Sequence, residues 1–417
     1  MLLQFNVTNV FSFKEEAILD LVANTDNSHE ENLIVYNKNR ILPTVAIYGA
    51  NAAGKSNLFK ALTSAILFVR NSSSMQINAR INVVPFLLDK DSRHQKRRFD
   101  FTFVYEGTKY EYGFVADEFK VYEEYLYEYK SAKASMIFER YDVNKYNYTT
   151  SLAGVLKPYE EKNTDNKLFL ATATAWNCKE TLNAFMWFAE GIDTYTHDSI
   201  EAVMVEELDG SDQDKVKEFA MDLLRQADFN ISDYDFSVKM GDVSKVQLPP
   251  GITIEDNAVL NGIKEWKLDM FHEVEEDGVV VRYPLPFHNE SNGTKTFFAY
   301  SPFIYKALKE GKTVVVDEID NGLHPMLVKY IVEIFNDPTV NKNGAQLIFN
   351  THDTTLLDLD VLRRDQIYFV EKDNSTGMSE LYSLSEFSAR KTEKVQKGYM
   401  QGRYGAVPNI GVGEIKW

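Results

Sequence analysis

One stretch of the sequence has residue types and a spacing that suit the binding of a phosphate chain: Gly49-Ala50-Asn51-Ala52-Ala53-Gly54-Lys55-Ser56. It fits G-x-x-x-x-G-K-[ST], a pattern in which glycines let successive backbone amides point at one phosphate group. Lys55 can place a positive charge on the β- and γ-phosphates, and the Ser56 hydroxyl can bind Mg²⁺. The pattern therefore predicts a nucleoside triphosphate site lined by Gly49, Asn51, Ala52, Ala53, Gly54, Lys55, Ser56 and Asn57.

The sequence on either side supplies the elements that must position this loop. The apolar run 44–48 predicts a buried strand, and apolar periodicity from Asn57 to about Val69 predicts a helix. This order puts the phosphates at a helix N-terminus, where the helix dipole and free amides favour an anion. A surface turn that matched the same motif by chance would not be expected to lie between such a strand and such a helix. We therefore predict that the chain binds ATP and Mg²⁺.

Two carboxylates stand where such a site needs them. The apolar strand that starts at Lys312 ends in Asp317 and Glu318. A carboxylate at this kind of strand end can complete the Mg²⁺ shell, and a second one can orient the attacking water. We therefore predict that Asp317 binds the metal together with Ser56, and that Glu318 is the catalytic carboxylate.

Two more polar motifs precede or follow predicted elements of the same region. Ser291-Asn292-Gly293-Thr294 leads into a helical pattern at 297–309 and is either an ordinary helix cap or a second phosphate site. Thr351-His352-Asp353 follows the buried strand expected at 346–350. A histidine at a strand end can sense the γ-phosphate, so His352 is a second candidate catalytic residue.

Composition limits the class of protein. The chain has 417 residues, enough for one to three domains, and its net charge of −17 argues against a uniformly basic surface for nucleic acid. A local basic patch stays open. The single cysteine, Cys178, suggests a reducing compartment, and no apolar run reaches the roughly 18–20 residues of a membrane span. Since the first residues also lack a signal-peptide pattern, we expect a cytoplasmic protein.

The remaining sequence predicts strands first and helices later. The first forty residues read as a strand pair, with strands near 2–7, 9–13 and 17–21, and a loop or irregular segment over 24–40. Further strands are expected at 83–88, 99–105, 109–115, 121–130 and 136–148, of which 99–105 and 109–115 form a hairpin. The alternating aromatics are taken as core rather than as stacking platforms for bases. Helices at 168–189 and 212–226 and short strands over 229–280 follow.

A basic cluster lies in the loop 89–98 and at the start of the next strand. Its members could contact DNA, a partner or the nucleotide phosphates, although a solvated hairpin tip is the favoured interpretation; they are Arg93, Lys96, Arg97 and Arg98.

The order of the motifs resembles an ABC-type ATPase head of the SMC/RecF/OLD-like branch, over about 1–150 and 284–371. The resemblance rests on five motifs: the P-loop, Ser291-Asn292-Gly293-Thr294, Asp317-Glu318, Asp320 to Pro325 and Thr351-His352-Asp353. The segment Asn9 to Phe13 is similar to the Asn-Phe-Arg-Ser-Phe stretch that opens many such heads. A counterpart of the Q-loop glutamine is not evident, although Gln95 lies in about the right interval.

This resemblance implies roles for individual residues. Ser291 and Gly293 would form the signature motif that binds ATP held by another protomer, and Asp320 would lie in the D-loop. Glu318 would be the general base and His352 the switch histidine. The resemblance therefore implies a homodimer or a higher homo-oligomer.

A narrower similarity is to the AAA-type ATPases of bacterial defence operons, including the RloA, abortive-infection and PARIS ATPase subunits. It is carried by 47–51, 290–295 and the tail Gly402 to Pro408, with Ala53 standing where many relatives have serine. Such subunits act beside a separate effector, often a Toprim-type nuclease. The tail either docks a partner or packs on the head.

These resemblances imply an ATPase that acts as the sensor or regulatory subunit of an anti-phage, abortive-infection-like system. The alternative is a DNA-repair or chromosome-maintenance ATPase, which usually needs a long coiled coil or a basic groove. An OLD-type nuclease is disfavoured because too little sequence follows His352 for a Toprim domain, and a scaffold with a dead site is disfavoured by intact Lys55, Asp317 and Glu318.

The predicted fold is α/β: a P-loop NTPase head of the ABC type with a central mixed sheet, an antiparallel β lobe and a mostly helical insertion. We expect residues 1–150 to form the N-terminal part of the head and 155–280 the insertion. Residues 284–417 should form the C-terminal part, with the signature, the Asp-Glu pair, the D-loop, the switch histidine and the tail.

Overall fold

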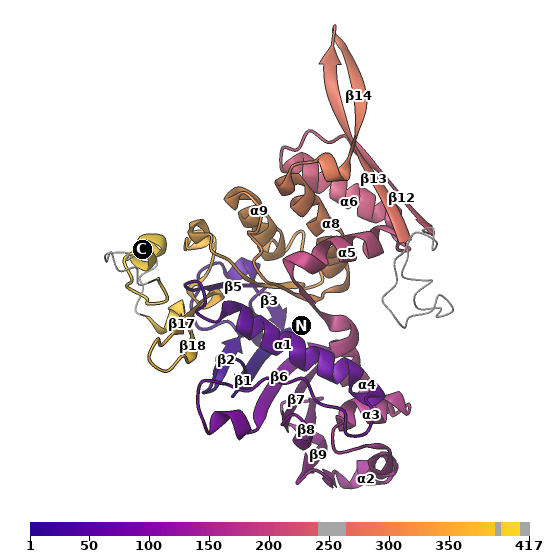
Figure 1. Cartoon of the computed structure of the whole chain (residues 1–417), viewed down its shortest axis with the longest axis vertical. Coiled ribbons are helices and arrows are strands. Elements are labelled where there is room, and N and C mark those ends of the chain that lie inside the picture. Colours follow the sequence, from indigo (N-terminus) through magenta and orange to yellow (C-terminus); the bar gives the residue numbers. More distant parts are fainter. Residues whose placement is uncertain (241–263, 388–392, 409–417) are drawn as a thin grey trace, which may run out of the picture. The chain divides into compact units, whose positions relative to one another are not determined.

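The computed structural model describes residues 1–240, 264–387 and 393–408. Backbone contacts divide the chain into two compact units (Figure 1). The first unit contains residues 1–196, 307–320 and 331–417, and the second contains 197–306 and 321–330. Described residues from both the N-terminal and the C-terminal part of the chain therefore contribute to the first unit.

The first unit contains the predicted central mixed sheet. Its strands lie in the order β11 (Ile192–Tyr195), β15 (Thr313–Val316), β16 (Gln346–Asn350), β5 (Thr44–Tyr48), β17 (Ile367–Lys372) and β18 (Ser379–Ser383). Neighbours are parallel except for β18, which runs antiparallel to β17. Every residue of β5, β15 and β16 is buried, as expected for parallel strands covered on both faces. The carboxyl ends of these three strands consequently lie at one edge of the sheet.

The same unit contains the predicted antiparallel lobe. Seven strands lie in the order β10 (Lys145–Tyr148), β9 (Ser135–Tyr141), β8 (Val121–Tyr129), β7 (Thr108–Ala116), β6 (Arg97–Tyr105), β1 (Leu2–Thr8) and β2 (Ala17–Asp20). Alternate residues of β6 are buried, and Phe103 stacks on Trp187 with ring centroids 4.1 Å apart. The hairpin of β6 and β7 and the pairing of β1 with β2 are confirmed. The P-loop helix α1 (Lys55–Asn71) packs Phe68 against Phe114 of β7.

Some local predictions for this unit are wrong. Residues 83–88 form no strand, because their backbone contacts a turn: Phe11 N donates to Val84 O, and Phe86 N donates to the Asn9 side chain. The segment 9–13 is that turn rather than a strand, with left-handed backbone at Asn9 and Phe11. Residues 24–40 include a small hairpin of β3 (Ile34–Tyr36) and β4 (Asn39–Ile41).

The helix expected over 168–189 is interrupted. It divides into α3 (Phe169–Ala175) and α4 (Lys179–Met186), because Asn177 between them has a φ of 65°. The short α2 (Thr150–Leu156) precedes them, and α10 (Val395–Met400) lies in the C-terminal segment. The aromatic rings that follow α4 pack on β6, and residues up to 196 belong to the first unit. The three-part division expected from the sequence stays a prediction.

The second unit combines helices with a small sheet. It contains α5 (His197–Leu208), α6 (Gln213–Gln226) and the first parts of α8 (Asn292–Glu310) and α9 (Pro325–Asn336). The helix predicted over 212–226 is confirmed as α6. The antiparallel strands β12 (Asp233–Met240), β13 (Lys264–Glu276) and β14 (Val279–Pro286) form its sheet, in which the β13–β14 hairpin extends beyond β12 (Figure 1). Part of the strand-rich stretch predicted over 229–280 lies outside the described residues.

Aromatic contacts join the helices of the second unit to its sheet. Phe298 of α8 lies edge-on to Tyr234 of β12 at 5.1 Å, and Phe297 stacks on Phe229 at 5.3 Å. No helix in the described part of the chain is long and apolar enough to span a membrane.

Candidate functional site

The P-loop leaves β5 at the edge of the central sheet and returns directly into α1. Gly54, the residue before the helix, has a φ of 122°, and a Cβ there would lie 2.4 Å from Ser379 Oγ and 2.8 Å from Ser12 Oγ. Ser379 Oγ donates to Ala53 O at 2.5 Å, and Asn57 Nδ2 donates to Ser12 Oγ at 2.9 Å. A side chain at position 54 would displace these contacts, so the loop requires glycine there.

Lys55 is folded over the loop that precedes it. Its ammonium donates to Gly49 O at 2.8 Å and to Ala50 O at 3.3 Å, and the residue is buried. Burial lowers the pKa of Lys55, and the carboxylates of Glu318, Asp320 and Asp317 oppose that change. The lysine charge is thus held at the start of α1 among three acidic side chains.

The Asp317 carboxylate accepts hydrogen bonds from helix α1 and from the end of strand β16. Ser56 Oγ donates to Asp317 Oδ1 at 3.1 Å, and the Asn350 amide, from the end of β16, donates to the same oxygen. A hydroxyl and a carboxylate oxygen in contact are the ligand types that Mg²⁺ prefers. The pair of Ser56 and Asp317 therefore fits a magnesium ion.

Asn350 also fixes the backbone of Glu318. Glu318 has a left-handed φ of 57°, and its N–H donates to Asn350 Oδ1 at 2.6 Å. The Glu318 side chain is exposed and lines the cavity around the P-loop. One buried amide side chain thus binds the Asp317 carboxylate and the Glu318 backbone at the end of β15.

Asp320 and His352 are neighbours at the next turn. The backbone N–H of His352 donates to Asp320 Oδ2 at 3.1 Å. Asp320 Oδ1 is buried and accepts no hydrogen bond from the residues that the structure describes. The His352 side chain is exposed at the same cavity as Glu318.

A cavity of about 850 Å³ surrounds the loop, and we call it the phosphate cavity. It brings together most of the predicted site residues of the first unit with one residue that the sequence did not suggest, Lys372 at the end of β17. Its lining is Ala50, Asn51, Ala52, Ala53, Gly54, Lys55, Ser56, Asn57, Glu318, His352 and Lys372.

Asn350 and Lys372 were missed at the level of sequence. Asn350 ends a buried strand directly before Thr351-His352, which was the available signal for a polar residue at the sheet edge. Lys372 had no such signal, since β17 becomes the neighbour of β5 only through the sheet order.

The signature candidates lie in the second unit. Ser291 is exposed, and its Oγ accepts a hydrogen bond from Thr294 N at 3.1 Å, so it caps the start of α8. Gly293 approaches the turn that contains Gly322, because a Cβ at position 293 would lie 3.3 Å from Gly322 O. The preceding Glu290 pairs with His272 of β13 at 2.7 Å. The cap is therefore present, and a role toward a second phosphate stays a prediction.

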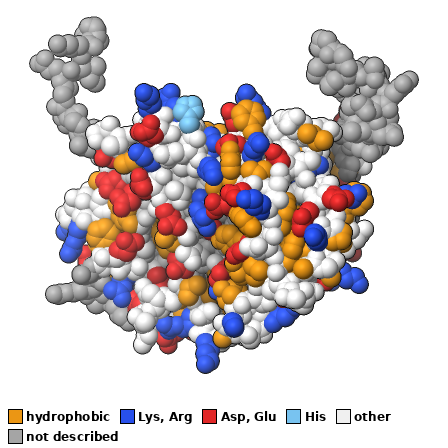
Figure 2. Space-filling model, turned by 90° about the horizontal axis from the view of Figure 1, so that it is seen from below, with side chains coloured by type: hydrophobic (Ala, Val, Ile, Leu, Met, Phe, Trp, Pro, Cys, Tyr) orange, Lys and Arg blue, Asp and Glu red, His pale blue; other side chains and the backbone are white. Residues whose placement is uncertain are grey.

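The basic cluster is engaged within the lobe. Arg97 is buried in β6, and Arg98 pairs with Asp100 at 2.8 Å. Lys96 lies 3.9 Å from the ring centre of Tyr122, and Arg93 donates to Leu87 O. On the face in Figure 2, basic side chains are scattered among acidic ones rather than gathered in one patch.

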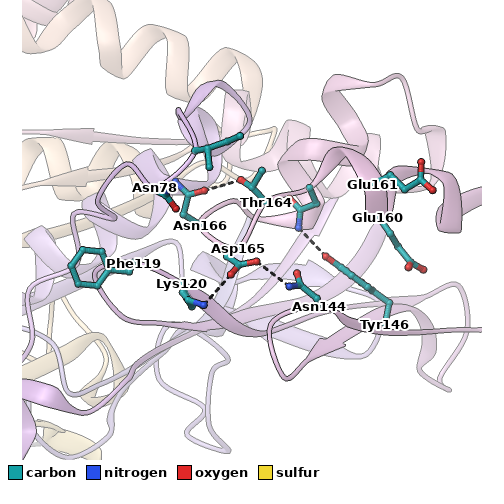
Figure 3. Close-up of a pocket in the computed structure, with 12 residues that line it drawn as sticks. Asn78, Phe119, Lys120, Asn144, Tyr146, Glu160, Glu161, Thr164, Asp165 and Asn166 are labelled. Atoms are coloured by element: carbon teal, nitrogen blue, oxygen red, sulfur yellow. Dashed lines mark hydrogen bonds and ion pairs between the residues drawn. The ribbon is translucent and has the colours of Figure 1, made fainter.

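A separate pocket of about 660 Å³ lies among the loops at the far end of the lobe (Figure 3). Its polar groups bind one another: Asp165 pairs with Lys120 at 3.0 Å and accepts from Asn144, and Thr164 donates to Asn166. Asn163 donates to Tyr146 in the same way. These contacts form a network among most of the polar residues that line the pocket.

The sequence of this chain matches a known protein family. Residues 45–358 match the family described as "AAA domain, putative AbiEii toxin, Type IV TA system". The chain belongs to this family. The matched range of this AAA domain starts in β5 and includes the P-loop, the carboxylates after β15 and His352. No curated protein matches the sequence.

Several solved structures are similar to this AAA-family chain. The SMC head domain from Thermotoga maritima has 11% identity and a TM-score of 0.41, covering 92% of this chain and 98% of that one. An SmcHead bound to the C-winged helix domain of ScpA has 12% identity and a TM-score of 0.39, covering 92% and 97%. The cbiO1 protein from Clostridium perfringens, part of the ABC transporter complex cbiONQ, has 13% identity and a TM-score of 0.30, covering 96% of each chain.

Proposed function

We propose that this AAA-family protein binds ATP with Mg²⁺ and hydrolyses it. The observation that carries the proposal is the network of Ser56, Asp317, Asn350 and the Glu318 backbone beside the P-loop. Ser56 and Asp317 would hold the ion, which supplies positive charge to the triphosphate when bound. Lys55 and the amides at the start of α1 would bind the phosphates.

Glu318 is proposed as the general base. Its carboxylate lines the phosphate cavity and is exposed, so it can accept a proton from water beside the terminal phosphate. The backbone at Glu318 is left-handed and is fixed by Asn350, which also binds the Asp317 carboxylate. The two carboxylates would then divide metal binding and proton transfer between them, with His352 at the γ-phosphate.

We further propose that two copies of the chain share their ATP sites. Ser291 is exposed at the start of α8, where a helix N-terminus favours an anion. A second copy's ATP would supply that anion, so ATP binding would close a homodimer or a larger ring of copies. Closure would control a separate effector, which we propose is a nuclease of the Toprim type.

The cellular role that we propose is regulation of an abortive-infection-like anti-phage system. The family description, with its AbiEii toxin and type IV toxin–antitoxin system, supports this role. Expression with the adjacent genes should reduce phage plating, and Lys55→Ala should restore it. Full plating with the intact genes would contradict the defence role, and sensitivity to DNA damage in a deletion strain would favour chromosome maintenance instead.

Glu318→Gln tests the chemical part of the proposal. The amide keeps the shape of the side chain but cannot act as a base, so the hydrolysis rate should fall by about 10²–10⁴ while ATP still binds. Glu106→Gln is the matched control, because Glu106 is also exposed and also has a left-handed φ, of 47°, in the β6–β7 turn. Equal turnover of the two variants would exclude Glu318 as the catalytic carboxylate.

A further inference from the structure

A second cavity, of about 1220 Å³, adjoins the phosphate cavity in the first unit. The two share the loop residues 50–53 together with His352 and Lys372. A ligand whose phosphates lie at the start of α1 can therefore extend from one cavity into the other. The second cavity is walled further by Leu88, by the turn after β17 and by the C-terminal segment.

The C-terminal segment, residues 393–408, is a built wall of this cavity. Tyr399 and Tyr404 both stack on Phe369 of β17, with ring centroids 5.4 and 5.8 Å away. Tyr382 OH donates to Tyr404 O at 2.8 Å, and Tyr399 OH donates to Ala406 O at 3.0 Å. The tail was expected either to dock a partner or to pack on the head, and these contacts show that it packs on the head.

This segment also contacts the strand that carries the P-loop. The ring of Tyr48, the residue directly before Gly49, lies edge-on to Tyr399 with centroids 6.1 Å apart. The Tyr48 hydroxyl is buried and has no hydrogen-bond partner within the described ranges. Burial raises the pKa of Tyr48 well above its usual value, so the hydroxyl stays protonated and can donate.

The exposed lining of the cavity combines two kinds of group. Leu88 and Met400 are 65% and 67% exposed, although residues of this size are usually covered, and both line the cavity. Asn374 and Thr354 add hydrogen-bonding side chains. Apolar surface with a few polar groups suits a flat heterocyclic base that carries a hydroxylated sugar.

We propose that this cavity takes the base and ribose of the nucleotide, and that the C-terminal segment supplies one wall of that subsite. The proposal rests on the proposed function, since the phosphates must lie at the P-loop. Covering Leu88 and Met400 with the base removes their apolar surface from water. The segment thereby makes affinity depend on the nucleoside and not only on the phosphates.

The test compares ATP with inorganic triphosphate, which has phosphates and no nucleoside. Met400→Asp should weaken ATP binding by about tenfold, because a charge replaces apolar contact with the base, and should leave triphosphate binding unchanged. Met326→Asp on α9 is the matched control, since Met326 is 63% exposed and lies outside both cavities. Leu88→Asp should repeat the effect, with Leu67→Asp of α1 as its control.

The outcomes separate the two proposals. If the wild-type protein binds neither ATP nor triphosphate, the proposed function fails. If both ligands bind and Met400→Asp and Leu88→Asp change neither affinity, or change both equally, the nucleoside subsite is refuted and the P-loop assignment stands. Should either variant fold poorly, 8-azido-ATP on the wild-type chain decides: labelling within 393–408 or at Leu88 supports the subsite, and labelling elsewhere overturns it.

Discussion

Replacement of Asn350 by alanine is the most informative single perturbation of the site. Asn350 is fully buried, its amide donates to the Asp317 carboxylate, and its oxygen accepts from Glu318 N. A hydrogen bond to a charged group contributes about 1.5–3 kcal/mol, and an N–H left without a partner costs about 1–3 kcal/mol. Asn350→Ala should therefore lower the free energy of unfolding by about 2.5–6 kcal/mol.

The same variant should lower turnover beyond its effect on stability. Loss of the fixed orientation of Asp317 and Glu318 should reduce kcat by about 10- to 100-fold, which corresponds to about 1.4–2.8 kcal/mol of transition-state stabilisation. The assay is steady-state ATP hydrolysis at saturating ATP, corrected for the folded fraction by circular dichroism. ATP affinity should change little, because Asn350 does not line the phosphate cavity.

Asn341→Ala is the matched control for this experiment. Asn341 is also buried, and its amide donates to Phe335 O and Ala345 O at 2.8 Å while its oxygen accepts from Ala345 N. Its loss should cost similar stability without touching the carboxylates. If the folded fractions of Asn350→Ala and Asn341→Ala hydrolyse ATP equally fast, the positioning role of Asn350 is refuted.

Three further predictions test the loop, the shared site and the tail. Lys55→Ala should weaken ATP binding by about ten- to a hundred-fold in a direct titration, since a charge-assisted contact of about 1.5–3 kcal/mol is lost, and unchanged affinity would remove the P-loop assignment. Ser291→Arg and Lys55→Ala should each be nearly inactive, but mixed subunits should regain part of the ATPase activity through one intact composite site. No recovery despite verified subunit exchange, with azido-ATP labelling only in cis, would exclude shared sites. Gly405→Ala should lower the melting temperature more than the control variant Gly107→Ala. Gly405 and Gly107 both have a left-handed φ, of 67° and 70°, but only at position 405 would the added Cβ lie 2.5 Å from another atom, Glu371 Oε2.

The sequence by itself determined the parts of this protein that depend on local pattern. The P-loop needs its glycines, lysine and serine in one short stretch between a strand and a helix, so its letters identify it. Buried parallel strands are continuous apolar runs, and this property marked 44–48, 313–316 and 346–350. Alternation with period two marked the β6–β7 hairpin.

Local pattern failed where a segment's partners are distant in the sequence and where a single residue interrupts a helix. Residues 83–88 are as apolar as a strand, yet their backbone bonds to the turn at Asn9 instead of to a neighbouring strand, and Leu87 and Leu88 are exposed. The break between α3 and α4 depends on one left-handed residue, Asn177, which periodicity does not detect. The pattern of apolar residues alone could not distinguish a strand, a turn and an interrupted helix in these segments.

Only the tertiary structure decided how the site is assembled. Asn350 joins Asp317 to Glu318 because β16 lies beside β15, and Lys372 reaches the P-loop because β17 lies beside β5. The sheet order places these strand ends at one edge, and no spacing in the sequence encodes that order. The tertiary structure likewise decided where the tail motif packs. Tyr404 stacks on Phe369, and an aromatic contact between residues so far apart in the sequence exists only in the folded protein.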